Sequence, residues 1–355
     1  MKIKAVVFSL KNGQEEGVGH FMAEGTAGQS HIVNAMLLCY AENRTNYGIA
    51  SYRLFDKWKK KYYRLPITKH LTVQEVGMMK RIMMFILLLA LFPWPAHASA
   101  ATVYTKKEDV YNIIKKNLIA RKDEFTIEMN AKVMNAIGRN GDIFNKIADI
   151  DSKKTAKDGD YLRLSVNSWA ASWSWSNYSD TASLTFSADY ETTAKQEKEL
   201  DTKIANILKS LKLEKKSDYA KVKAIHDYII KKTSYDQDLE YYSAYAALIG
   251  NSAVCQGYTL AAYRLFTGAG LESRIITGYA GGDSHAWNIV KVDGKWYNID
   301  LTWDDPVSET GEDLLTYDYF LKNAGDFNDH TRDSMYRTQA FVKKYPIAKA
   351  SYKKN

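Results

Sequence analysis

Hydrophobic positions between residues 101 and 215 alternate between helical and extended spacing. Lys106 to Ala120 predicts a helix, a strand-like segment follows at Phe125 to Met129, and another helix is predicted around residues 130–148. Lys195 to Leu213 then has the spacing of an amphipathic helix. We interpret residues 101–215 as an α+β helper region that precedes the functional core.

Residues 160–190 alternate with period two, which predicts a hairpin that turns at Asn177 to Asp180. Its two faces are marked by Leu162, Leu164 and Val166, and by Leu184, Phe186, Ala188 and Tyr190. The hairpin also carries an aromatic group formed by Trp169, Trp173, Trp175 and Tyr178. Such rings can stack on sugars or wall polymers, but they more often pack a sheet against a helix, and we favour packing.

The pattern changes at Ser217, which caps a predicted helix that runs to about Lys232. His226 lies on this helix, and a lone helical histidine is assigned no role. Another helical stretch, Tyr258 to Phe266, ends at Gly268 and Gly270. We place the core at residues 216–330 and a C-terminal tail at residues 331–355.

Most of the net positive charge lies before the globular part of the chain. The 355 residues carry a formal charge of +8. Residues 1–78 hold 11 basic and 6 acidic residues, and residues 101–355 hold 36 basic and 35 acidic residues. Nucleic-acid binding by counterion release needs clustered cations, so the near-neutral body disfavours that function.

A secretory signal is predicted within residues 79–100. Lys80 and Arg81 precede an apolar run from Ile82 to Phe92, and Ala98-Ser99-Ala100 has the small residues of a cleavage site. The run is too short to span a membrane, which needs about 20 residues. We therefore expect an exported protein, secreted or held at the cell surface or wall, that has no stable membrane span.

Signals of this kind stand at an N-terminus, so residues 1–78 need an explanation. The codons of Gln74-Glu75-Val76 can contain a ribosome-binding sequence a few nucleotides before Met78 and Met79. We expect translation to begin at one of these methionines, with residues 1–78 a mis-annotated extension that is disordered or not translated. Its weak periodicity predicts no clear elements.

The predicted mature chain then has a single cysteine, Cys255, and no intrachain disulfide. Free cysteines are usually buried and inert. Cys255, however, stands at the start of a predicted helix, where unpaired backbone N–H groups and the helix dipole stabilise a thiolate and can hold an oxyanion. Gln256-Gly257 allows close backbone approach there.

A predicted hairpin supplies the partners of this cysteine. Segments His285 to Val292 and Lys295 to Trp303 flank Asp293-Gly294, a typical two-residue hairpin turn. If Val292 opposes Lys295, then His285 and Asp300 lie on one face as diagonal neighbours, about 7 Å apart at Cβ. Cys255, His285 and Asp300 then form a nucleophile, a base and an orienting group.

These segments resemble the transglutaminase-like superfamily. The matching pieces are AVCQGYT around Cys255, the Arg274 to Gly278 strand, DSHAWNIV around His285 and GKWYNIDLTWDDP around Asp300. They are most similar to exported bacterial members and cover about residues 216–325. The resemblance implies an α+β, papain-like core in which a Cys-bearing helix packs on an antiparallel sheet.

The resemblance also implies a reaction. The Cys255 thiolate attacks a carboxamide or peptide carbonyl of an extracellular or wall protein or peptide, His285 protonates the leaving amine, and water or a second amine resolves the thioester. Tyr235, Gln256 and Trp287 are further candidates for oxyanion or substrate contacts. No cofactor is implied, and no Cys/His pair has metal-ligand spacing.

Two alternatives remain open at the level of sequence. Peptidase or amidase activity and cross-linking use the same three residues and differ in whether water or an amine reaches the thioester first. A non-catalytic surface-binding or wall-binding module that retains the fold is a different class of function, which the intact Cys255, His285 and Asp300 disfavour.

Overall fold

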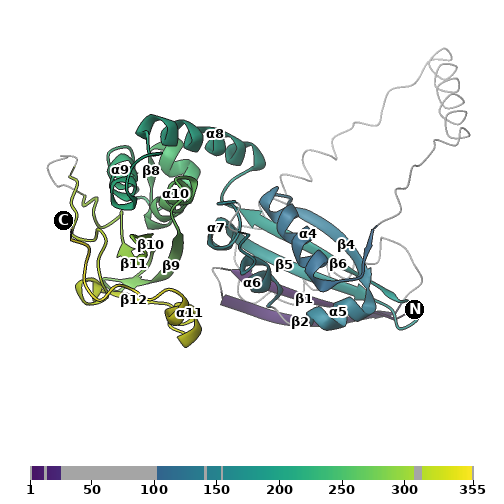
Figure 1. Cartoon of the computed structure of the whole chain (residues 1–355). Helices are drawn as coiled ribbons and strands as arrows, with labels where there is room; N and C mark the ends of the chain where they lie inside the picture. Colours follow the sequence, from purple (N-terminus) through teal and green to yellow (C-terminus); the bar gives the residue numbers. More distant parts are fainter. Residues whose placement is uncertain are drawn as a thin grey trace, which may run out of the picture. The chain divides into compact units, whose positions relative to one another are not determined.

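A six-stranded sheet occupies the first part of the described chain (Figure 1). Its spatial order is β2, β1, β5, β6, β4, β3. The strands span, in that order, Gln14–Glu24, Lys2–Lys11, Val166–Trp175, Thr181–Tyr190, Glu124–Asn130 and Val103–Tyr104. Strand β5 runs antiparallel to both β1 and β6, and the short β3 is parallel to β4.

This computed structural model describes residues 2–11, 14–24, 102–139, 142–152, 155–307 and 314–353. Nearly all of them belong to one compact unit, formed by Lys4–Phe21 and Val103–Asn355. The predicted signal peptide, the predicted start at Met78 or Met79 and the second cysteine, Cys39, lie outside the described residues.

No clear helix or strand is predicted in residues 1–78, but two segments of this region, β1 and β2, are strands. Strand β1 pairs with β5 along a register that sets Leu10 opposite Trp169. Because β5 is distant from β1 along the chain, local periodicity does not predict this pairing. Where translation begins stays a prediction.

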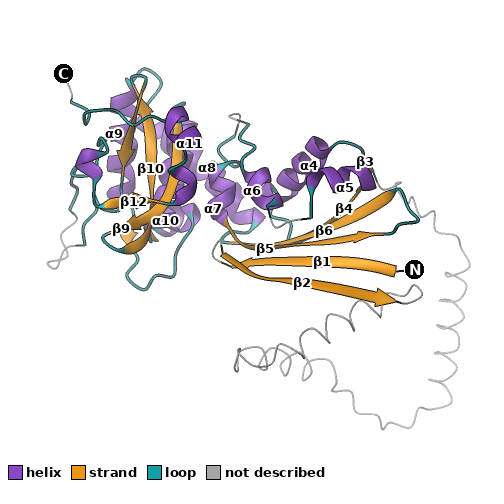
Figure 2. Cartoon of the chain, turned by 90° about the horizontal axis from the view of Figure 1, so that it is seen from below, coloured by secondary structure: helices purple, strands orange, loops and turns teal. Residues whose placement is uncertain are grey.

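Three helices cover one face of the six-stranded sheet (Figure 2). They are α4 (Lys107–Ile119), α5 (Ala131–Ile137) and α6 (Ile143–Ala148). The single helix predicted around 130–148 is therefore two helices, since the chain leaves α5 at Gly138 with a φ of 81°, a conformation that favours glycine.

The aromatic hairpin packs as predicted. Trp169 and Trp173 are buried between sheet and helices, and Trp169 stacks on Phe186 and Phe144. Trp175 packs at the edge of the same cluster beneath Arg139. Tyr178, in the turn, is exposed. Two of the four rings thus serve as core side chains of the sheet.

Residues Asp160–Ser165, predicted as the start of the hairpin, form the short helix α7 instead. Tertiary contacts explain the difference. The Asp160 carboxylate accepts hydrogen bonds from the Arg274 guanidinium and from the backbone N–H of Ile275. Leu162 packs into the cluster under the six-stranded sheet, while Tyr161 joins the second core.

A second, four-stranded antiparallel sheet has the order β11, β10, β9, β12. Its strands span, in that order, Lys295–Ile299, Asp283–Val292, Ser273–Ala280 and His330–Arg332. Helix α10 (Cys255–Gly268) packs against β9 and β10, and α8 (Ala194–Leu211) and α9 (Asp218–Ile230) pack against α10. The architecture is α+β, with a cysteine-bearing helix on an antiparallel sheet.

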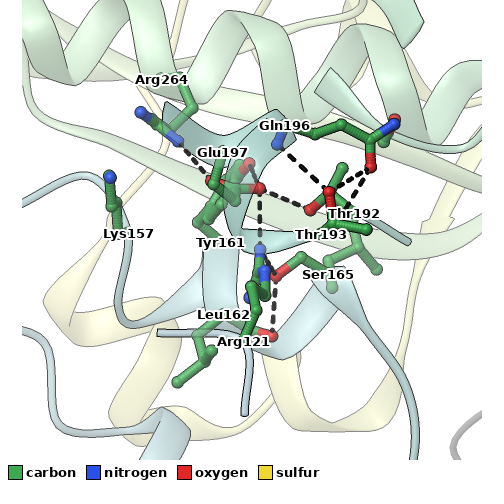
Figure 3. Close-up of polar contacts among 12 residues, drawn as sticks. Arg121, Lys157, Tyr161, Leu162, Ser165, Thr192, Thr193, Gln196, Glu197 and Arg264 are labelled. Carbon is green, nitrogen blue, oxygen red and sulfur yellow. Dashed lines mark hydrogen bonds and ion pairs between the residues drawn. The ribbon is translucent and has the colours of Figure 1, made fainter. Parts of the chain in front are cut away.

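Helix α8 joins the core rather than the six-stranded sheet, because its apolar face belongs to the same buried cluster as α10. Figure 3 shows the polar side of this junction, which centres on Glu197. Its carboxylate accepts hydrogen bonds from Arg121 at 2.9 Å, Tyr161 at 2.8 Å and Thr192 at 2.7 Å, and from Arg264 of α10 at 3.3 Å. Burial alone would raise the pKa of Glu197, but these donors lower it below its ordinary value.

The predicted hairpin register is confirmed, since Val292 opposes Lys295 and Asn288 opposes Ile299. Asp293 and Gly294 both have positive φ, 49° and 80°, as the tight turn requires. The second strand is shorter than predicted: β11 ends at Ile299, and the chain then enters a turn in which Asp304 N–H donates to the Asp300 carbonyl.

The segment after Arg332 also packs on this sheet. Tyr336 belongs to the buried cluster that contains Trp287 and Trp296. Helix α11 (Gln339–Lys344) follows, and Phe341, Tyr345 and Ile347 pack against the same cluster. Within the described ranges, no helix combines the length and the apolar character that a membrane span requires.

Candidate active site

Cys255 is the first residue of α10 and is partly exposed. Val254 precedes it in extended conformation, and no side chain caps the helix. Among the described residues, no acceptor takes the backbone N–H of Cys255 or of Gln256. The sulfur therefore stands at the positive end of the helix dipole, beside two unpaired donors.

Close backbone packing fixes the start of this helix. A Cβ on Gly257 would lie 2.5 Å from the Cβ of Ala253 and 3.0 Å from the carbonyl oxygen of Ser243. The preceding strand β8 (Ser252–Ala253) pairs in parallel with β7 (Ser234–Tyr235). The thiol is thus carried by a turn that only glycine at 257 allows to pack this closely.

His285 is buried on β10 and faces Asp300. Its Nε2 lies 2.7 Å from Oδ2 of Asp300. Burial lowers the pKa of His285, but hydrogen bonds to Asp300 and to Cys255 outweigh it and raise the pKa to about 10. The imidazole is therefore close enough to both the carboxylate and the thiol for each to raise its pKa.

Asp300 is 1% exposed, and both of its oxygens are engaged. Oδ1 accepts the backbone N–H groups of Thr302 at 2.9 Å and Trp303 at 3.3 Å. Burial raises the pKa of Asp300, but hydrogen bonds from His285 and His330 bring it down to about 2. Cys255, His285 and Asp300, which the sequence predicts as a site, are thus brought together.

The three further candidates occupy different environments. Tyr235 is half-buried near the thiol, and its pKa is raised by burial and then by the charge of Cys255. The side-chain amide of Gln256 donates to the carbonyl of Leu164 at 3.1 Å, so it faces α7. Trp287 is 1% exposed, stacks beside His285 with 6.3 Å between ring centroids, and its Nε1 has no partner among the described residues.

Sequence reasoning missed His330, the second imidazole on Asp300. Its Nε2 lies 3.0 Å from Oδ2 of Asp300, and its Nδ1 lies 2.7 Å from Oδ1 of Asp329. Candidate ligand atoms of His285, Asp300 and His330 lie within 4.8 Å of one another, the only group of this kind among the described residues. Because His285 lies on β10, Asp300 in the turn after β11 and His330 on β12, no spacing motif marks them.

The sequence pattern also indicates no role for His226, yet this side chain is fully buried on α9. Its Nε2 lies 3.0 Å from Oδ2 of Asp304, and its Nδ1 lies 3.1 Å from Oδ1 of Asp227. Burial lowers the pKa of His226, and the two carboxylates raise it above its ordinary value. This second pair joins α9 to the turn that follows Asp300.

A cysteine at a helix start, with a buried imidazole and carboxylate on an antiparallel sheet, defines a thiol site of the papain-like class. Residues 205–301 match the family model of the transglutaminase-like superfamily. This part of the chain, which contains Cys255, His285 and Asp300, is therefore similar to a transglutaminase-like core domain.

Individual relatives are more distant. The chain is 26% identical over 151 residues to kyphoscoliosis peptidase of Mus musculus, a match that covers 36% of this chain and 23% of that protein. A solved transglutaminase structure is 16% identical with a TM-score of 0.30, covering 58% of this chain and 60% of that one. A Cytophaga hutchinsonii structure, proposed to be a cysteine protease, is 21% identical with a TM-score of 0.25, covering 46% and 61%. The chain thus covers less than two thirds of the length of each of these three proteins.

Proposed function

We propose that this chain is an exported, cysteine-dependent acyl-transfer enzyme that acts on carboxamide or amide bonds of proteins or peptides. The observation that carries the proposal is the position of His285, which lies 2.7 Å from Asp300 and has the Cys255 thiol among the groups that raise its pKa. An imidazole whose pKa is raised to about 10 is protonated at neutral pH, and an adjacent imidazolium favours a thiolate nucleophile.

The reaction follows from this arrangement. The Cys255 sulfur forms a bond to the carbonyl carbon, and the oxygen that becomes negative is held by the unpaired N–H groups of Cys255 and Gln256. His285 gives its proton to the leaving nitrogen as the carbon–nitrogen bond breaks, which leaves a thioester. Water or a primary amine then attacks the thioester, His285 takes the proton of the attacking group, and the thiolate departs.

Whether water or an amine completes the cycle decides between peptidase or amidase activity and transglutaminase activity. The test incubates the purified chain with a glutamine-containing protein, with and without a labelled primary amine. Incorporated label identifies a transferase, whereas ammonia or new chain termini without label identify a hydrolase. Both activities must disappear in Cys255→Ala. Substrate binding that persists in Cys255→Ala, with no product from the wild type, would instead favour a surface-binding module.

Export and the nature of the substrate belong to the same proposal. The basic, apolar and small-residue order of residues 79–100 supports export, and an exported enzyme would meet extracellular or wall proteins and peptides. N-terminal sequencing of the native product tests this directly. A mature end at Ser99 or Ala101 supports it, and a native peptide recovered from residues 1–77 contradicts both the signal and the proposed start.

A further inference from the structure

His330 is buried at its side chain, which is 1% exposed, although its backbone lies on the edge strand β12. Its two ring nitrogens face two different carboxylates, Asp300 at 3.0 Å and Asp329 at 2.7 Å. The second oxygen of Asp329 accepts the Tyr319 hydroxyl at 2.6 Å. Asp329 is therefore fixed in place and is not a passing surface contact.

The partners of His330 define its proton content. An ionised carboxylate only accepts hydrogen bonds, so both contacts are satisfied together only when both ring nitrogens carry a proton. Both carboxylates favour the ionised form. Burial raises the pKa of each, but hydrogen bonds lower the pKa of Asp300 to about 2 and place that of Asp329 below its ordinary value.

Aromatic rings enclose the imidazole on its remaining sides. Four ring centroids lie between 3.9 and 5.5 Å from that of His330, and they belong to Phe327, Trp303, Trp287 and Tyr319. Aromatic faces attract a cation within about 6 Å of the ring centroid, and they exclude the water that would screen its charge. The titratable groups that face His330 are Asp300, Asp329, His285 and Tyr319.

We propose that His330 is a positioning residue of the Cys255 site, which holds the Asp300 carboxylate ionised and aimed at His285. This inference rests on the proposed function of Cys255. The chain of contacts then alternates in charge from the thiolate through His285, Asp300 and His330 to Asp329. Buried charges are stable only when each has such a partner, and the positive charge of His330 offsets part of the cost of burying Asp300.

A purely structural His330 would only fill space among aromatic rings. The two roles predict different effects on the stability of the Cys255 thiolate. If His330 keeps Asp300 ionised, its removal weakens the stabilisation of the His285 imidazolium and hence of the thiolate. The pH below which Cys255 loses its reactivity must then rise. If His330 only packs, its removal lowers the unfolding temperature and leaves that pH unchanged.

The experiment measures the rate of Cys255 alkylation by iodoacetamide against pH, with EDTA present and with the labelled peptide identified by mass spectrometry, so that Cys39 does not interfere. It compares the full chain with His330→Gln, which keeps a neutral donor to Asp300. The acid midpoint is the pH at which the alkylation rate falls to half of its maximum. We expect the acid midpoint of His330→Gln to rise by about one pH unit, because one opposite charge near an ionised group shifts its titration by about 1–3 units. Asp329→Asn should shift the midpoint in the same direction by a smaller amount.

His226→Gln is the matched control, since it removes another buried imidazole from a carboxylate pair. It should lower the unfolding temperature without moving the acid midpoint. If folded His330→Gln has the same acid midpoint as the wild type, the inference about His330 is overturned and the proposed function stays intact. If His330→Gln does not fold, Asp329→Asn decides in the same way. A wild-type Cys255 that reacts no faster than a free thiol overturns the proposed function itself.

Discussion

Nε2 of His285 lies 2.7 Å from Oδ2 of Asp300, and this contact decides which ring nitrogen is available to Cys255. The carboxylate can only accept, so the proton on Nε2 is fixed and Nδ1 is the nitrogen left for the thiol. The backbone donors of Thr302 and Trp303 hold the other oxygen of Asp300. The orientation of the base is therefore built into the turn that follows β11.

Asp300→Asn should lower kcat/KM by about 10³–10⁴-fold while the chain remains folded. The amide keeps the shape of the carboxylate but presents an N–H or a neutral oxygen to Nε2, so it favours the wrong tautomer of His285 and removes the charge that holds its proton. Turnover of the substrate found in the amine-incorporation assay measures the effect. Asp180→Asn, in the exposed hairpin turn, should match the wild type. Activity of Asp300→Asn within tenfold of the wild type would contradict the role of Asp300.

The stability of the fold should depend on pH through His285. Its pKa is about 10 in the folded chain and 6.5 without the fold, so the folded state binds the extra proton between these values. The stability from His285 is therefore fully present below pH 6.5 and declines as pH rises toward 10. In urea unfolding, the difference between the wild type and His285→Gln should shrink from pH 6 to pH 9.5. A difference that grows over this range would show that the imidazole is buried neutral.

Local signals in the sequence were sufficient for the central hairpin. The Asp293-Gly294 turn fixes the register, and the register places His285 and Asp300 on one face. The same reasoning overextended the second strand, because the ladder ends at Ile299 and Asp300 reaches His285 from a turn. The two side chains still meet, at 2.7 Å, because both are long enough to span the distance between a strand and a turn.

Other parts of the site come from contacts that no local pattern encodes. His330 contacts Asp300 because β12 pairs with β9 at the edge of the sheet. A strand of only three residues is too short for its sequence pattern to predict this pairing. The alternation of its neighbours predicts a strand at Asp160, but its bonds to Arg274 and Ile275 favour a helical turn. In both cases tertiary partners outweigh the local preference of the segment.

Gly257→Ala should destabilise the fold by about 1–3 kcal/mol, the usual cost of forcing an extra methyl group into a packed site. The new Cβ would lie 2.5 Å from Ala253 and 3.0 Å from the Ser243 carbonyl, so the first turn of α10 must shift and Cys255 with it. Activity should fall further than the loss of folded protein accounts for. Gly250→Ala is the control, because no atom lies within 4 Å of its new Cβ. Equal stability of the two variants would show that the turn relaxes freely.

Glu197→Ala should be among the most destabilising single substitutions in the described chain. It leaves the buried guanidinium of Arg121 without its carboxylate and removes one of the two carboxylates bound to Arg264, and breaking a buried ion pair costs about 3–5 kcal/mol. Glu199→Ala, two residues along α8, removes a carboxylate that is 44% exposed and should cost less than about 1 kcal/mol. Urea unfolding of the two variants measures the contrast. Since Arg264 lies on the helix that begins with Cys255, Glu197→Ala should also slow the alkylation of Cys255 under conditions where the protein is still folded. An unchanged alkylation rate would show that this junction stabilises the fold without positioning the thiol.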